Sequence, residues 1–186
     1  GGNVMEYFEK TIKTDEIYKG NIIKVQNLTV SLPNGKEATR DIVLHPGASV
    51  VIPINEHGEL YMVKQFSKPL DLPTLELPAG KLDSAGEDPK VCAERELMEE
   101  TGLRAEKIEH LISIHTTPGF CNEVIHMFTA TGLTQGESCT DEDEFLDVEK
   151  IHVSKLVNMI LEHKITDAKT IIGVLLAERM IREKDI

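Results

Sequence analysis

Three glutamates in the middle of the chain, Glu96, Glu99 and Glu100, are spaced to act together on a cation. An α-helix advances about 100° per residue, so positions i, i+3 and i+4 lie on one face. Three carboxylates on one face repel one another unless a cation sits among them. Carboxylate oxygens are ligands that suit magnesium. The spacing therefore predicts a metal-binding helix face, and the alternative is an ordinary solvated acidic surface.

The flanking residues predict where this helix begins and ends. Asp88 suits the N-cap, Pro89 suits the first helical position, and Gly102 stands where a helix usually stops. The residues expected to supply its buried faces are Val91, Ala93, Leu97 and Met98. Cys92, on the same helix, is expected to be a small core residue.

From Glu87 onward the chain reads E-x7-R-E-L-x-E-E-x-G-L, which resembles the Nudix box of the Nudix hydrolases. Six residues, 81–86, separate Gly80 from Glu87, one more than the family usually has, and we interpret this as a lengthened loop. Every later position is in register with the box. The resemblance implies a Nudix hydrolase with this helix at its catalytic centre.

The same resemblance implies a role for each box residue. Glu96 and Glu100 are the expected ligands of magnesium, with manganese as an alternative metal, and Glu99 lies within reach of the same ions as a further catalytic residue. The metal ligands that the resemblance implies also include the backbone carbonyl of Ala79. The residues implied to orient the ligating carboxylates are Glu87 and Arg95.

Composition limits the classes of function. The 186 residues suffice for one globular domain with a modest appendage, and a net charge of −12 argues against a nucleic-acid-binding surface. That charge would also repel a phosphate-bearing substrate unless divalent metal ions invert the local field. We expect no membrane association, because neither an apolar run of spanning length nor a signal-peptide pattern occurs. Three scattered cysteines, Cys92, Cys121 and Cys139, predict a reducing cytoplasm without a disulfide frame.

Hydrophobic patterning predicts the elements and three segments. Residues 1–4 resemble a tag remnant, 5–45 form an N-terminal β segment, and 46–186 form the Nudix domain, with the boundary at His45-Pro46-Gly47. The expected strands are 8–12, 21–32, 38–44, 48–54, 59–66, 74–77, 109–115, 122–130 and 145–151, and the expected later helices are 153–163 and 167–183. The fold class is α/β. The resemblance implies the Nudix α/β/α sandwich, preceded by a small antiparallel β-sheet.

Segments outside the box resemble the ADP-ribose pyrophosphatases. Pro118 follows Gly102 by sixteen residues, within the sequence TTPGFCNE at 116–123. Further similar segments are LPAG at 77–80, VKQF at 63–66 and DAKT at 167–170. The resemblance implies hydrolysis of ADP-ribose to AMP and ribose 5-phosphate. The substrate contacts expected from these segments are Gln65, Pro118, Gly119 and Glu123.

Two positions bear on phosphate and nucleoside binding. The subfamily commonly has arginine after Gln-Phe, whereas this chain has Ser67 followed by Lys68, which supplies charge without bidentate geometry. Arg40 matches a region that in relatives helps to bind the adenine or a terminal ribose. The alternative for Arg40 is an ordinary surface arginine.

The general base is expected in the acidic run at 140–145. Glu144, directly before Phe145, is the first choice and Glu142 the second, by similarity to the subfamily's late loop. The alternative is an acidic loop without a catalytic role.

The N-terminal segment predicts a homodimer, because it is too small to bury a core of its own. Its apolar positions need to be covered by another surface, among them Ile23, Val25, Leu28 and Val30.

Two other functions remain open: a Nudix pyrophosphatase acting on another nucleoside diphosphate derivative, such as a sugar nucleotide or NADH, and a non-catalytic Nudix ligand sensor. The retained box glutamates and the absence of a basic patch weigh against the sensor.

Overall fold

The computed structural model describes residues 7–83, 86–136 and 146–183. The chain divides into two compact units. The first comprises the chain up to Pro46 together with His115–Val124, and the second comprises Gly47–Ile114 and the chain from Ile125 onward. No helix in the described part of the chain combines the length and the apolar character needed to cross a membrane.

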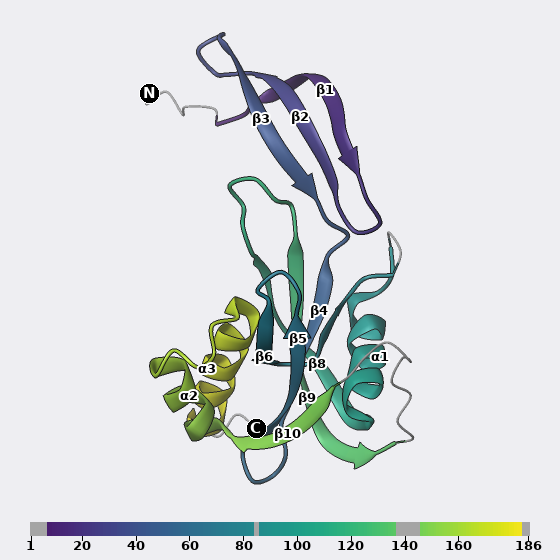
Figure 1. The fold of residues 1–186 in the computed structure, drawn as a ribbon, viewed down its shortest axis with the longest axis vertical. Coiled ribbons are helices and arrows are strands. Elements are labelled where there is room, and N and C mark those ends of the chain that lie inside the picture. The colour runs from purple at the N-terminus through teal and green to yellow at the C-terminus, as the bar shows by residue number, and fades with distance from the viewer. Residues whose placement is uncertain (1–6, 84–85, 137–145, 184–186) are drawn as a thin grey trace, which may run out of the picture. The chain divides into compact units, whose positions relative to one another are not determined.

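The first unit is built on a three-stranded antiparallel sheet in the order β1-β2-β3 (Figure 1). Its strands are β1 (Lys10–Lys19), β2 (Lys24–Ser31) and β3 (Glu37–Leu44). The predicted hairpin between β2 and β3 is present, with Gly35 at φ 79° and its N–H donating to the carbonyl of Leu32. β1 is longer than the expected strand 8–12 and pairs along the whole of β2. Its polar, exposed residues have no strong alternation that would have predicted this length.

The segment around Pro118 is hydrogen-bonded to the end of β3 within this unit. Val43 N donates to the carbonyl of Phe120 at 2.7 Å, and Asn122 N donates to the carbonyl of Val43 at 3.1 Å. The side chain of Asn122 also accepts from His45 N at 2.8 Å. A loop distant in sequence is therefore fixed to the strand that leads to the predicted boundary.

The second unit contains two sheets. One has the order β7-β4-β9-β8, in which β4 is parallel to β9 and antiparallel to β7. The other has the order β10-β5-β6, and both of its pairings are antiparallel. The strands are β4 (Ala48–Pro53), β5 (Glu59–Ser67), β6 (Leu72–Glu76), β7 (Ala79–Lys81), β8 (Leu103–His115), β9 (Val124–Gln135) and β10 (Asp147–His152).

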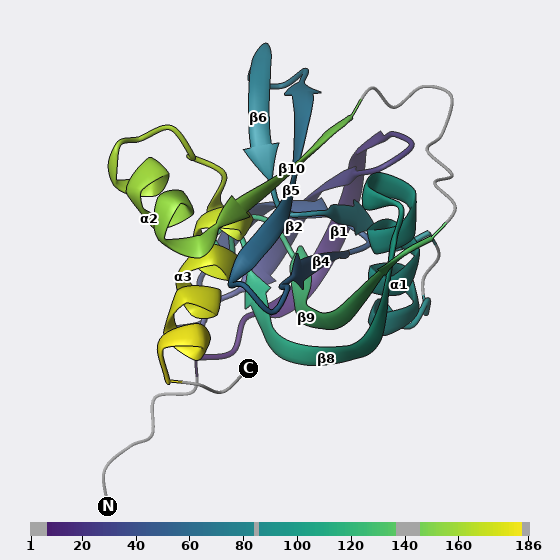
Figure 2. The ribbon, with the colours of Figure 1, turned by 90° about the horizontal axis from the view of Figure 1, so that it is seen from below.

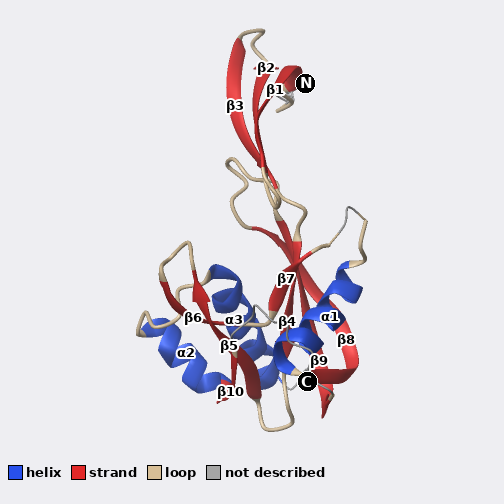
Figure 3. Cartoon of the chain, turned by 45° about the vertical axis from the view of Figure 1, so that its right-hand side comes forward, coloured by secondary structure: helices blue, strands red, loops and turns tan. Residues whose placement is uncertain are grey.

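Helices cover both faces of the β4–β9 layer (Figures 2 and 3). They are α1 (Pro89–Thr101), α2 (Val153–Leu161) and α3 (Ala168–Glu183). Alternate β4 residues point to opposite faces. One buried cluster joins Ile52 to Val174 of α3, and the other joins Val51 to Leu97 of α1. This arrangement confirms the expected α/β/α sandwich.

Several boundaries differ from the sequence-based expectation. The short strand β7 lies where a turn was expected, β8 begins at Leu103 rather than residue 109, and β9 extends to Gln135 rather than residue 130. These extensions are stabilised by backbone pairing to neighbouring strands, a long-range contribution that local apolar patterns do not report. The helices α2 and α3 begin within one residue of their predicted starts.

Candidate active site

Helix α1 is held in place by local capping interactions. Asp88 Oδ1 accepts a hydrogen bond from Lys90 N at 2.9 Å, and Pro89 occupies the first turn. Gly102 ends the helix in the left-handed region, at φ 69°, where glycine has no steric penalty. Ser49 Oγ donates to the carbonyl of Pro89 at 2.7 Å and so ties this end to β4. The predicted start and stop are confirmed.

The buried face of α1 carries two of the three predicted ligands. Its buried residues are Cys92, Ala93, Glu96, Leu97 and Glu100. Glu96 is 8% and Glu100 6% exposed, which is rare for carboxylates unless they have partners. The expectation for Val91 was wrong, since it is 53% exposed. The face that turns inward follows the glutamate stripe, and Val91 lies off that stripe.

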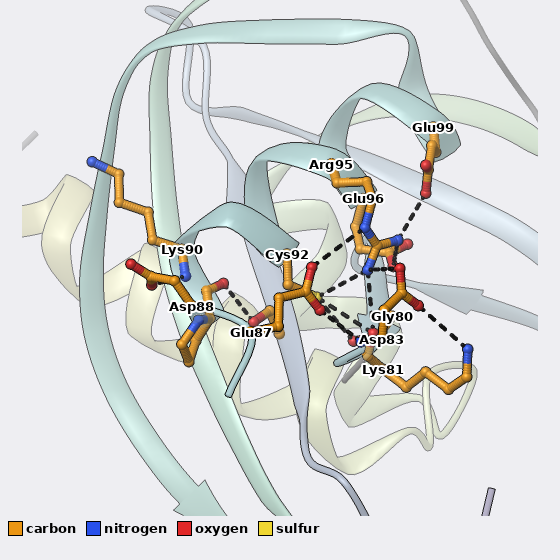
Figure 4. A network of polar contacts seen from close by, with 12 residues as sticks. Gly80, Lys81, Asp83, Glu87, Asp88, Lys90, Cys92, Arg95, Glu96 and Glu99 are labelled. Atoms are coloured by element: carbon orange, nitrogen blue, oxygen red, sulfur yellow. Dashed lines mark hydrogen bonds and ion pairs between the residues drawn. The ribbon is translucent and has the colours of Figure 1, made fainter. Parts of the chain in front are cut away.

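Arg95 supplies the cation that the clustered carboxylates require (Figure 4). Its Nη1 donates to Glu96 Oε1 at 2.6 Å and to Glu99 Oε2 at 3.0 Å. Burial alone would lower the pKa of Arg95, but Glu96 and Glu99 raise it above its ordinary value. Arg95 therefore stays charged and holds two box carboxylates together.

The predicted pairing of Arg95 with Glu87 is a long ion pair. Arg95 Nε lies 3.7 Å from Glu87 Oε1, and this nitrogen is buried without a hydrogen-bond partner among the described residues. Glu87 Oε2 accepts instead from Asp83 N at 2.6 Å, and Asp83 Oδ2 lies 3.5 Å from Arg95 Nη2. Glu87 thus links the loop before α1 to the guanidinium of Arg95. Asp83 takes part through its backbone N–H, which contacts Glu87, and through its carboxylate, which contacts Arg95.

Two glutamates one turn apart reach the same short backbone segment. Glu100 Oε2 accepts from Ala79 N at 2.9 Å. A β-carbon built on Gly80 would lie 1.9 Å from Glu96 Oε1, so the carboxylate of Glu96 occupies space that only glycine leaves open. The start of β7 at Ala79–Gly80 and the stripe Glu96–Glu100 therefore fit together closely.

The donor set suits a hard divalent cation, which binds through oxygen. The structure brings together the carboxylates of Glu96 and Glu100 and the backbone of Ala79 and Gly80, and the missing side chain at Gly80 makes the room. Within the described ranges, no three His, Cys, Asp or Glu side chains are arranged around a single point that could hold a metal ion. The reason is that Glu96 and Glu99 point to Arg95, while Glu100 points to Ala79 N. The residues fit a metal site whose carboxylates now have protein partners.

A cavity of about 580 Å³ opens between the β5–β6 hairpin and the start of α3. Its lining includes the predicted substrate residues Gln65, Ser67 and Lys68. Lys68 Nζ is exposed and lies 2.7 Å from Asp71 Oδ1. Exposed ion pairs of this kind contribute little to stability, so Asp71 holds Lys68 only weakly.

Sequence reasoning missed one charged group in this cavity. Lys169 forms ion pairs with Glu76 and with Asp167, the latter at 3.0 Å, and all three line the cavity. Burial alone would lower the pKa of Lys169, but Asp167 and Glu76 raise it. The signal was present in the DAKT segment at 167–170, which sequence analysis used only as a mark of resemblance.

The remaining predicted substrate residues belong to the first unit. Arg40 forms a bidentate pair with Glu9, through Nε at 3.0 Å and Nη2 at 2.6 Å. Pro118 and Gly119 form a turn, and Glu123 accepts from Thr116 Oγ1 at 2.7 Å and lies 3.3 Å from His45 Nδ1. Arg40 therefore already has a carboxylate partner.

The two candidates for the general base, Glu142 and Glu144, lie outside the described residues. Their role stays a prediction from the sequence.

Comparison with known proteins agrees with this geometry. The protein-family model of the NUDIX domain matches residues 43–172. The chain is 48% identical over 168 residues to the Methanol dehydrogenase activator of Bacillus methanolicus, covering 89% of this chain and 90% of that protein. It is 42% identical over 164 residues to the ADP-ribose pyrophosphatase of Bacillus subtilis (strain 168), covering 87% and 88% respectively. A solved ADP compounds hydrolase has the same fold, with a TM-score of 0.83 at 18% identity over 95% of both chains. The chain belongs to the NUDIX family and is a Nudix hydrolase.

Proposed function

We propose that this enzyme hydrolyses the diphosphate bond of ADP-ribose, giving AMP and ribose 5-phosphate, with magnesium or manganese as its metal. The observation that carries the proposal is the convergence of Glu96 and Glu100 on the backbone of Ala79 and Gly80 in β7. The 42% identity to an ADP-ribose pyrophosphatase over most of the chain supports the substrate. Nudix hydrolases generally need a divalent metal ion, and this donor set is of the kind that binds one.

The residues of the site divide the work of hydrolysis. Glu96, Glu100 and the carbonyl of Ala79 would hold the metal, with Glu99 beside them. When bound, the metal neutralises charge on the diphosphate and lowers the pKa of water. Arg95 and Glu87 hold the carboxylates in position before the metal arrives, since Arg95 Nη1 already contacts Glu96 and Glu99.

In the second unit, substrate positioning falls to the β5–β6 cavity. Gln65, Ser67 and Lys68 would contact the phosphates or the terminal ribose from the cavity. Ser67 donates one hydrogen bond where an arginine would donate two, so phosphate binding depends more on Lys68. The remaining proposed substrate contacts are Arg40, Pro118, Gly119 and Glu123.

Proton removal from the attacking water is assigned to Glu144, with Glu142 as the second choice. Either glutamate would act as a general base by accepting a proton from the attacking water. This assignment follows from the position of Glu144 directly before Phe145 in the sequence.

A substrate panel tests the proposed function. Purified protein with Mg²⁺ is given ADP-ribose, NADH, a sugar nucleotide and a nucleoside triphosphate, and products are separated by chromatography. We expect the highest kcat/KM for ADP-ribose, with AMP and ribose 5-phosphate released in equal amounts. A higher value for a sugar nucleotide or NADH would keep the enzyme class and reassign the substrate.

A second function is favoured by the relative of 48% identity that is named a Methanol dehydrogenase activator. In this alternative the chain acts on a dehydrogenase, in addition to or instead of a free nucleotide. The test is the rate of methanol oxidation by purified methanol dehydrogenase with and without this protein. A rate increase that Glu96→Gln abolishes would support the second function, and an unchanged rate would leave the free nucleotide as substrate.

We also propose a cytoplasmic homodimer formed through the N-terminal sheet. Among the described residues before Pro46, Val30 alone is a buried hydrophobic, at 2% exposure. The large apolar side chains left exposed there are Tyr7, Phe8, Ile12, Ile17, Tyr18 and Ile22. Fully burying each would contribute about 1.5–3 kcal/mol, which favours an isologous partner. The scattered cysteines support a reducing compartment.

Light scattering tests the assembly. We expect twice the chain mass at micromolar concentration, and loss of both the dimer and the activity when residues 1–45 are deleted. A fully active sample with the mass of one chain would contradict the dimer.

A further inference from the structure

The first turn of α3 holds the backbone that leads into the proposed metal site. Lys169 lies between Glu76 and Asp167 and is mostly buried, with 19% of its side chain exposed. The side chain of Glu76 is 12% exposed and accepts a second hydrogen bond, from Thr74 Oγ1 at 2.6 Å. Glu76 is therefore fixed from two sides, three residues before Ala79.

Leu77, the next residue, is held by α3 through both its backbone and its side chain. Thr170 is fully buried, and its Oγ1 accepts a hydrogen bond from Leu77 N at 2.9 Å. A β-carbon on Gly173 would lie 2.4 Å from Leu77 Cδ1, so the helix approaches as closely as it does because residue 173 is glycine. The hydroxyl of Thr170 and the close approach of α3 at Gly173 both restrain Leu77.

These contacts add to two supports on other sides of the segment. The carbonyl of Pro78 accepts from Val51 N in β4 at 2.8 Å. Ala79 N donates to Glu100 of α1. Residues 76–79 are thus held by α3, β4 and α1 in turn. Together these supports restrict the backbone of residues 76–79, which carries the Ala79 carbonyl.

A largely buried ion pair is a weak source of stability, since desolvation offsets most of its attraction. Its more dependable effect is to hold groups in one geometry. The exposed ion pair of Arg179 with Glu183 joins two residues of α3 itself. Lys169 differs from them by reaching across to another element.

We propose that Lys169 and Thr170 are positioning residues of the active site. They fix the backbone path of residues 76–79 and so orient the Ala79 carbonyl toward the metal. This inference rests on the proposed function, because it concerns the metal used in that reaction. It assigns to α3 a part in catalysis without contact to the substrate's reacting atoms.

The test compares Lys169→Met and Thr170→Val with Arg179→Met, a control on the same helix. The electron paramagnetic resonance of free Mn²⁺ measures Mn²⁺ affinity. Circular dichroism and thermal melting report on folding, and steady-state kinetics with ADP-ribose measures turnover. We expect Kd for Mn²⁺ to rise about tenfold in the first two variants, the low end of what residues that orient metal ligands contribute. At a fixed Mn²⁺ concentration their kcat should fall more than their KM rises, and Lys169→Arg should recover part of the affinity.

A purely structural role predicts a lower Tm with Mn²⁺ affinity unchanged in the folded variants, and that result would overturn the proposal. Should Thr170→Val not fold, Lys169→Met decides the question by itself. A wild-type protein that binds Mn²⁺ but leaves ADP-ribose intact would overturn the substrate assignment. Weakened Mn²⁺ binding by Lys169→Met in that same protein would still support the positioning role.

Discussion

Arg95 Nη1 lies 2.6 Å from Glu96 Oε1, and the two residues are neighbours in sequence on helix α1. The same nitrogen lies 3.0 Å from Glu99 Oε2, so a single guanidinium neutralises two carboxylates of the box. A site prepared for a divalent cation has to remain folded when the cation is absent. The guanidinium of Arg95 supplies positive charge for that state through one nitrogen that contacts both carboxylates.

Replacing Arg95 tests this relationship. Arg95→Gln should lower the free energy of unfolding by about 1–3 kcal/mol in metal-free buffer, because mostly buried carboxylates lose their charged partner. Urea denaturation in EDTA measures the change. The control is Arg179→Gln, which breaks an exposed ion pair and should cost less than about 1 kcal/mol. Equal losses of unfolding free energy in the two variants would show that Arg95 stabilises the fold no more than an exposed ion pair does.

Gly80→Ala tests the fit between β7 and Glu96. Its β-carbon would lie 1.9 Å from Glu96 Oε1, so the carboxylate must move away from β7. We expect Mn²⁺ affinity to fall about tenfold or more while the far-ultraviolet circular dichroism stays unchanged. Wild-type Mn²⁺ affinity in the folded variant would show that Glu96 does not need its observed position.

The assignment of the general base predicts a separation of kinetic constants. Glu144→Gln should lower kcat about 100-fold or more and leave KM nearly unchanged, because a base acts on the chemical step. Glu142→Gln should have a milder effect. Steady-state kinetics with ADP-ribose measures both variants. A reversed order would move the base to Glu142, and two wild-type rates would remove the base from this segment.

Histidine titration predicts how stability depends on pH. Burial, and then the neighbouring His110, lower the pKa of His126 below its ordinary value of 6.5, while Ser113 Oγ lies 2.8 Å from its Nδ1. The unfolded chain therefore takes up this proton first as pH falls, and stability is lost from about pH 6.5 down to the folded pKa. His126→Asn should lose less stability than wild type between about pH 7 and 5.5.

Thermal melting across that range measures the difference. His57→Asn, which changes an exposed histidine in the turn before β5, is the matched control and should follow wild type. A His126→Asn variant with the wild-type pH profile would contradict the account.

Helix α1 was predictable because its signals are local. Asp88, Pro89 and Gly102 mark its ends through capping and backbone geometry, and the spacing of Glu96 and Glu100 follows from helical periodicity. The inward face was predicted less well, as Val91 demonstrates. Apolar character alone would turn Val91 inward, whereas in the structure Glu96 and Glu100 are on the buried face of α1.

Long-range partners were not predictable from one sequence. Lys169 meets Glu76 across 93 positions, and Thr170 meets Leu77 across the same separation. No local pattern reports such a contact, because it depends on how α3 packs against the sheet. The full lengths of β8 and β9 were missed for the same reason, since interstrand pairing extends them beyond their apolar residues.

The most direct test of the account is the rate at which AMP forms from ADP-ribose in wild type, Glu100→Gln and Glu94→Gln. Glu94 is exposed on the same helix and serves as the control. Losing a metal ligand should slow AMP formation about 100-fold or more, since metal stabilisation of the transition state amounts to several kcal/mol and each tenfold in rate corresponds to about 1.4 kcal/mol. We predict that Glu94→Gln stays within about twofold of wild type, as expected for surface substitutions, and that EDTA abolishes the wild-type rate. Undiminished AMP formation by a folded Glu100→Gln, or by wild type in EDTA, would contradict the account.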